Sequence, residues 1–234
     1  MKKVLEKTLS GLIFLVFWNA IAIAETTSAE VGGTNISIVP PQAWCMIDPS
    51  KLSDARLIGI LRDGFRQSGS TFVIAYAECG ELERWRTATQ KTLNNYAILA
   101  FDDGLREFVY PGTDASFASE LRQILENQGQ EYLVARLERE KEVVEDVIPD
   151  TMELGKPTIL GIVGEDGFSV YLGGKIPMKT EFGDLKITTF TTGTTLLNRK
   201  VVSTYLYTDN DNDPVYSGLL GKHKSWTARL RAAN

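Results

Sequence analysis

The sequence predicts a single α+β domain over residues 35–234, with a mainly antiparallel sheet sandwiched by helices. Apolar residues recur at helical spacing near the start, in the middle and at the end of the chain. The second half also contains short segments rich in Thr, Val and Tyr, which are typical of strands. No internal repeat or low-complexity linker divides the chain. Helices and antiparallel strands in one undivided chain favour a sheet that packs against helices.

Residues 1–24 are expected to be a secretory signal peptide. A head with three lysines precedes an apolar run over residues 9–24, which is shorter than the ~20 residues of a comfortable membrane span. The run ends in Ala22-Ile23-Ala24, a small-x-small sequence that a signal peptidase can read. We therefore expect cleavage after Ala24 and a periplasmic or secreted protein, with an uncleaved membrane anchor as the alternative. Residues 25–34 are small and polar, and they are expected to be a flexible leader.

Three strands and two helices are expected in the first half of the domain. Apolar alternation or continuous apolar runs predict strands over residues 35–39, 71–77 and 95–101. The second of these strands is apolar on both faces, which favours a central strand covered by helices on each side. Ser53-Asp54 can cap a helix that ends near Ser68-Gly69. A short charged helix is expected over residues 81–91.

The second half is expected to consist of a long helix, two hairpins and a closing helix. The apolar stripe that begins at Asp114 loses phase at Asn127-Gln128-Gly129, so a break or kink is expected there. Alternating segments predict two antiparallel hairpins, formed by residues 158–163 with 168–172 and by residues 185–195 with 200–208. The closing helix begins at Asp213-Pro214, because proline suits the first helical position.

The two cysteines, Cys45 and Cys79, are predicted to form a disulfide. An even number of cysteines behind a signal peptide is typical of an oxidising compartment. Each cysteine follows an apolar segment with strand character, and strand ends that lie side by side bring the two Cβ atoms within bonding range. Two free thiols or a redox-active pair are the alternatives, although the spacing is not C-x-x-C.

Composition excludes several classes of function. The chain is 43% hydrophobic, which is ample for a core, and its formal net charge is −5. An acidic protein is a poor partner for nucleic acid, whose phosphates need a basic surface. The same charge argues against polybasic attachment to anionic lipids. No stable membrane insertion is expected once the signal peptide has been removed.

No motif predicts a catalytic residue, a metal site or a cofactor. His223 is the single histidine, and it lies on the apolar stripe of the closing helix, so we expect it to pack in the core. Residues 209–213 alternate like a calcium loop, but the glycine and the glutamate that an EF-hand needs are missing, which favours a polar turn. Asp102 and Asp103 are adjacent, and adjacent strand residues point to opposite faces, so a turn before Gly104 explains them better than an acid–base pair.

Two segments resemble the Mog1/PsbP-like family. Residues 36–44, with the sequence ISIVPPQAW, resemble the family's opening strand, although Ala43 stands where the family usually has glycine. The hairpin, acidic turn and helix over residues 191–230 resemble its ending, and the two segments cover about a quarter of the chain. The resemblance implies an antiparallel sheet between helices and an accessory or partner-binding protein. It transfers no functional residue.

The leading interpretation is an exported, non-catalytic accessory or binding protein, whose partner is a protein or a small apolar ligand held between sheet and helices. A hydrolase-type enzyme that works without histidine is one alternative, and a membrane-tethered structural protein of the envelope is another. Convergent carboxylates in a concave site favour the enzyme. An apolar groove favours the binding protein.

Overall fold

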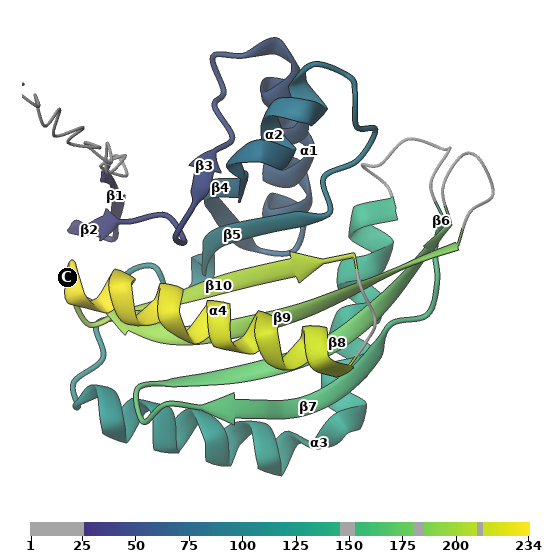
Figure 1. Ribbon diagram of the computed structural model, residues 1–234. Helices are drawn as coiled ribbons and strands as arrows, with labels where there is room; N and C mark the ends of the chain where they lie inside the picture. Colours follow the sequence, from purple (N-terminus) through teal and green to yellow (C-terminus); the bar gives the residue numbers. More distant parts are fainter. Residues whose placement is uncertain (1–25, 146–152, 180–184, 210–212) are drawn as a thin grey trace, which may run out of the picture.

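In the computed structural model, residues 26–145, 153–179, 185–209 and 213–234 are described, and they form the predicted α+β fold (Figure 1). The predicted signal peptide, residues 1–24, lies outside these ranges. Within the described ranges, no helix is long and apolar enough to cross a membrane.

An antiparallel sheet of eight strands forms the centre of the fold. Its strands follow the order β3-β4-β5-β10-β9-β8-β6, and β7 also pairs with β8. They are β3 (Trp44–Met46), β4 (Ser70–Glu78), β5 (Asn95–Asp102), β6 (Glu153–Leu154), β7 (Thr158–Glu165), β8 (Ser169–Lys179), β9 (Leu185–Leu197) and β10 (Lys200–Thr208). Both predicted hairpins are confirmed as β7–β8 and β9–β10. The second turns at Asn198 and Arg199, whose φ angles of 48° and 65° are typical of a two-residue hairpin turn.

Helices cover both faces of the sheet. They are α1 (Leu52–Gln67), α2 (Cys79–Arg86), α3 (Asp114–Glu145) and α4 (Asp213–Ala232), with a 3₁₀ turn η1 (Asp103–Leu105) after β5. Helix α4 lies across β9 and β10 on one face, while α1 and α3 pack against the other (Figure 1). Helix α3 runs through Asn127–Gly129 without a break, but Figure 1 shows it changing direction along its length, so of the predicted break or kink the break is wrong and a kink agrees with the structure. One glycine costs about 1 kcal/mol in a helix interior, which a helix of 32 residues tolerates.

A two-stranded hairpin replaces most of the predicted leader. Strands β1 (Thr27–Val31) and β2 (Thr34–Ile38) pair in antiparallel register, so the prediction of a flexible leader over residues 25–34 is wrong for this part. Gly32 and Gly33 have φ angles of 51° and 72°, the left-handed conformation that a Gly-Gly hairpin turn needs. A Cβ atom on Gly32 would also lie 2.1 Å from the backbone oxygen of Arg106. The small, polar composition of this segment concealed a hairpin signal.

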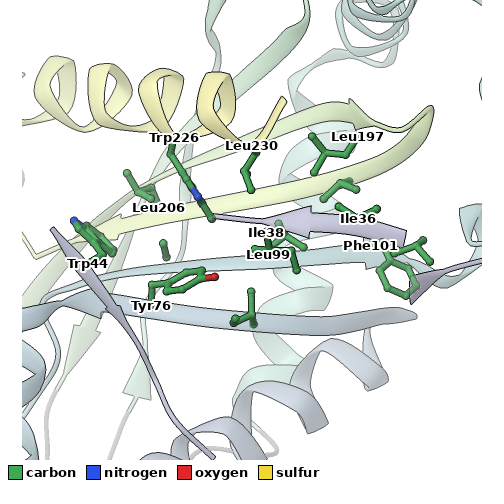
Figure 2. Packing of buried hydrophobic residues seen from close by; sticks show 14 of the residues in the cluster. Ile36, Ile38, Trp44, Tyr76, Leu99, Phe101, Leu197, Leu206, Trp226 and Leu230 are labelled. Carbon is green, nitrogen blue, oxygen red and sulfur yellow. The ribbon is translucent and has the colours of Figure 1, made fainter. Parts of the chain in front are cut away.

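The hairpin and α4 close the core on one face of the sheet. Figure 2 shows Trp226 and Leu230 pointing from α4 toward the sheet, with Ile36 and Ile38 of β2 beside them. The Trp226 ring meets the Tyr76 ring edge to face at 6.3 Å between centroids, and its Nε1–H donates to the backbone oxygen of Val39 at 2.8 Å. The apolar stripe predicted for the closing helix is therefore the buried side of α4.

Asn234 joins the C-terminal end of the described chain to β2. Its side-chain Oδ1 accepts from the backbone N–H of Ser37 at 2.9 Å, and its Nδ2 donates to the backbone oxygen of the same residue at 2.8 Å. The Asn198 side chain also donates to Asn234 Oδ1 at 3.1 Å. Residues 197 positions apart are thus linked by a pair of hydrogen bonds.

Asp54 has a different role from the predicted helix cap. The residue at the N-cap of α1 is Lys51, and it makes no side-chain capping bond. The Asp54 carboxylate is instead fully buried and forms an ion pair with Arg86 at the end of α2. Burial disfavours its charged form and is the largest single effect, but the interactions with Arg86, the backbone N–H of Asp48 and the Ser53 hydroxyl together outweigh it and lower the pKa of Asp54. Arg86 also donates to the backbone oxygen of Met46 at 3.3 Å, so this pair ties α1 and α2 to β3.

Candidate apolar binding site

An apolar pocket lies between α1 and the sheet. This α1 pocket has a volume of about 230 Å³. Helix α1 contributes Leu61 and Phe65, while Ile176 and Met178 of β8 and Tyr207 of β10 lie opposite. The described residues that line it include no Asp, Glu, Lys or Arg, and their polar groups are hydroxyls. The pocket is suited to uncharged, apolar groups.

A second pocket lies between α3 and the same face of the sheet. This α3 pocket has a volume of about 410 Å³. Its walls are Phe117, Leu121 and Ile124 of α3, together with Val170 and Leu172 of β8. The described lining contains two charged residues, Asp102 and Glu120, both carboxylates.

The two pockets adjoin. Phe190, Thr192 and Tyr205 line both of them, and we call these three residues the junction. They come from the neighbouring strands β9 and β10, where Tyr205 and Thr192 are direct cross-strand partners. The α1 and α3 pockets therefore adjoin along one sheet face, and the junction is the part of the wall that they share.

The alternation of β9 divides its residues between the pockets and the core. Phe190, Thr192 and Thr194 face the pockets, while Thr191 and Gly193 face α4, as expected for side chains that alternate along a strand. Gly174 on β8, the cross-strand partner of Phe190, leaves room for the phenyl ring. A Cβ atom at Gly174 would lie 2.5 Å from that ring.

A buried ion pair lies behind the α1 pocket. Thr188, a lining residue, donates its hydroxyl to Asp209 at 2.7 Å, and Asp209 pairs with Lys186. Burial raises the pKa of Asp209, although Lys186 works against this shift. Burial and the nearby Asp209 charge also raise the pKa of Tyr96, another lining residue, so its phenol stays protonated. Residues 210–212 of the predicted polar turn lie outside the described part of the chain.

His223 is a packing residue on the opposite face of the sheet, as predicted. It is fully buried, and its ring meets Tyr171 edge to face at 5.1 Å between centroids. Its two nitrogens lie 2.7 Å from the Thr191 hydroxyl and 2.8 Å from the Thr204 hydroxyl. Gly193 provides the room, because a Cβ atom there would lie 3.0 Å from Nε2.

The hydrogen bonds fix the neutral form of this ring. Thr204 donates its hydroxyl proton to the backbone oxygen of Gly193 at 3.1 Å, so its oxygen accepts from Nε2–H of His223. Nδ1 is then the acceptor for the Thr191 hydroxyl. Burial without a charged partner lowers the pKa of His223 to about 3.

We expect His223→Gln to cost about 1 kcal/mol of unfolding free energy near neutral pH, since it replaces a packed ring but keeps polar atoms. Between its unfolded pKa of 6.5 and its folded pKa of about 3, the wild-type histidine binds a proton only when unfolded. The wild type therefore loses stability as pH falls through this window, and the variant lacks this loss. Urea unfolding at about pH 7 and about pH 4.5 measures both effects. An equal loss of unfolding free energy between about pH 7 and about pH 4.5 in the two proteins would contradict this expectation. Because His223 lies away from both pockets, His223→Gln should leave the function of the protein unchanged.

The predicted disulfide is confirmed. The Sγ atoms of Cys45 and Cys79 lie 2.00 Å apart and their Cα atoms 4.9 Å apart. Cys45 is on β3, opposite Ala77 near the end of β4, and Cys79 begins α2 directly after that strand. The strand ends lie side by side as expected, and the bond is consistent with an oxidising compartment.

The two acidic candidates, Asp102 and Asp103, hydrogen-bond to different groups. Asp102 accepts from the backbone N–H of Gly104 at 2.8 Å, and Asp103 accepts from the Thr71 hydroxyl at 2.6 Å, so both belong to the predicted turn. Nowhere in the described ranges do three or more His, Cys, Asp or Glu residues gather in a group that could hold a metal ion.

The sequence patterns predict a ligand between sheet and helices but identify none of the lining residues. The small residues on the pocket face are Gly174 of β8 and Thr188, Thr192 and Thr194 of β9, and the neighbouring small residues on the other face hide this pattern. No family model matches the chain, and no curated protein matches it. The resemblance to the Mog1/PsbP-like family therefore stays a prediction.

Proposed function

We propose that this protein is an exported binding protein that holds a small apolar ligand in the adjoining α1 and α3 pockets. The observation that carries the proposal is the shared junction, which places two mostly apolar pockets side by side. The α3 pocket alone, at about 410 Å³, has the size of a small-molecule site. The lining is mostly aliphatic and aromatic, as in such sites.

The polar groups at the junction favour binding over acid–base catalysis. They are the hydroxyls of Thr192 and Tyr205, and neither type of hydroxyl ionises near neutral pH. The histidine lies on the other face of the sheet, and its hydrogen bonds go to Thr191 and Thr204. A general base at the junction would have to be supplied by the ligand.

Export is part of the proposal. The Cys45–Cys79 disulfide and the predicted signal peptide both point to an oxidising compartment, the periplasm or the cell exterior. Intact-mass analysis of the exported protein distinguishes cleavage after Ala24 from a retained anchor. The retained form would favour the membrane-tethered alternative.

Filling the junction is expected to abolish binding. N-phenylnaphthylamine, an uncharged apolar probe that brightens in apolar surroundings, should bind the wild type in a saturable manner. Thr192→Phe places a ring where the two pockets meet and should raise the Kd of the probe about ten-fold or more. The matched control is Thr158→Phe, which adds the same ring at an exposed position of β7 outside both pockets.

Two outcomes would contradict the proposal. One is a wild type without saturable binding, and the other is a folded Thr192→Phe protein with the wild-type Kd. If Thr192→Phe does not fold, photolabelling of the wild type replaces it. An alkyl diazirine should then label residues of the two pockets, and labelling confined to other surfaces would overturn the proposal.

A further inference from the structure

Exposed apolar side chains mark the edge of the α3 pocket beside η1 and α3. Three of its lining residues are large hydrophobic side chains that remain exposed, namely Leu105 (39%), Phe108 (43%) and Ile124 (51%). None of the described residues that line the α1 pocket is an exposed large hydrophobic residue. These three exposed side chains form a rim from which a ligand reaches the α3 pocket, and the α1 pocket, whose described lining is uncharged, adjoins it at the junction.

The charged groups in the described lining of the α3 pocket are carboxylates. Asp102 and Glu120 line the α3 pocket, the first half-buried and the second exposed. Asp102 Oδ1 accepts from the backbone N–H of Gly104, and a carboxylate retains further acceptor capacity after one such bond.

The nearby arginines are engaged elsewhere. Arg106 places its guanidinium 5.6 Å from the ring centroid of Phe101, which belongs to the core on the opposite face. Arg122 pairs with Glu126 and with Glu165, at 2.8 Å in each case. The charged residues that line the described part of the α3 pocket are thus both carboxylates, and neither arginine is among the lining residues.

We propose that the ligand is a single-chain amphiphile with a cationic head, such as a long-chain amine, an inference that rests on the proposed function. The alkyl chain passes the junction into the α1 pocket, where no described lining residue is charged. The ammonium head stays at the rim, where Asp102 and Glu120 accept its hydrogen bonds. A fatty acid of the same length would bring a carboxylate to the same two carboxylates and is disfavoured.

Three ligands that share one alkyl chain but differ in head group distinguish the contribution of the head to binding from that of the chain. Dodecylamine, dodecanol and dodecanoate, each below its micellar concentration, are titrated as competitors of N-phenylnaphthylamine on the wild-type protein. Dodecylamine should bind about ten-fold more tightly than dodecanoate at low salt, with dodecanol between them. The preference should shrink as salt is added, because the rim is exposed.

Variants of the two rim carboxylates test whether these residues cause the preference for dodecylamine over dodecanoate. Asp102→Asn with Glu120→Gln should bring the dodecylamine and dodecanoate affinities to within about three-fold of each other, with dodecanol unchanged. The control is Glu107→Gln, which removes one exposed carboxylate outside the lining and should keep the full preference.

The outcomes distinguish this inference from the proposed function. Dodecanoate binding as tightly as dodecylamine overturns the cationic head and leaves the apolar site in place. If the Asp102→Asn, Glu120→Gln protein still prefers dodecylamine, the two carboxylates do not bind the head group and the cationic-head inference is wrong. If Glu107→Gln loses the preference equally, the preference comes from the net charge of the protein, and the inference is wrong as well. Failure of all three ligands to compete overturns the proposed function itself.

Discussion

Replacing Cys45 and Cys79 together by serine is expected to lower the free energy of unfolding by about 3–4 kcal/mol. The bond closes a loop with a sequence separation of 34, which contains α1 and β4. Without the bond, the unfolded chain regains the freedom that this loop had lost. Urea unfolding of the oxidised wild type and of the double variant measures the difference.

Reduction supplies the control for this experiment. Dithiothreitol should destabilise the wild type to about the level of the Cys45→Ser, Cys79→Ser protein and leave that variant unchanged. A loss below about 1 kcal/mol would contradict the loop-closure argument. Two alkylatable thiols in the exported native protein would contradict the bond itself.

Trp226→Ala is expected to cost about 3–5 kcal/mol, the usual range for truncating a buried aromatic side chain. Trp226 is 1% exposed and packs against Tyr76. Its loss would leave a cavity under α4 and would remove the donor to the buried backbone oxygen of Val39. Thermal or urea unfolding measures the change, and Leu52→Ala, at a residue that is 92% exposed, is the control with an expected change below about 0.5 kcal/mol. Similar costs for the two variants would contradict the assigned core.

Local sequence patterns were sufficient to predict the helices and strands that have one clearly apolar face or that are joined by a short turn. The stripe on α4 predicted the buried side of that helix, and His223 could be assigned to the core because its neighbours on the stripe are apolar. The β9–β10 pair followed from alternation over residues 185–208, where each strand has one face on the α4 core. The disulfide followed from an even count and two strand ends.

The remaining features depend on partners that are distant in the sequence. Asp54 looked like a helix cap because it stands next to Ser53, but its partner Arg86 is 32 residues away. Strand β1 and the turn before β2 looked like a leader because this segment is short and polar, and the burial of the hairpin depends on α4. The pockets could not be read from the sequence, because alternation shows which face of a strand points inward and not whether helices fill that face.

The contact between β2 and the end of the described chain constrains the order in which the protein folds during synthesis. The face of the sheet that carries Tyr76 and Leu99 is completed by α4 and by Asn234, which are synthesised after every strand of the sheet. Until α4 has been made, the β1–β2 hairpin lacks the helix that packs against it, and contacts between segments distant in sequence form slowly. The chain therefore cannot complete this core until synthesis has passed α4. An incompletely folded chain suits translocation across a membrane, which agrees with the proposed export.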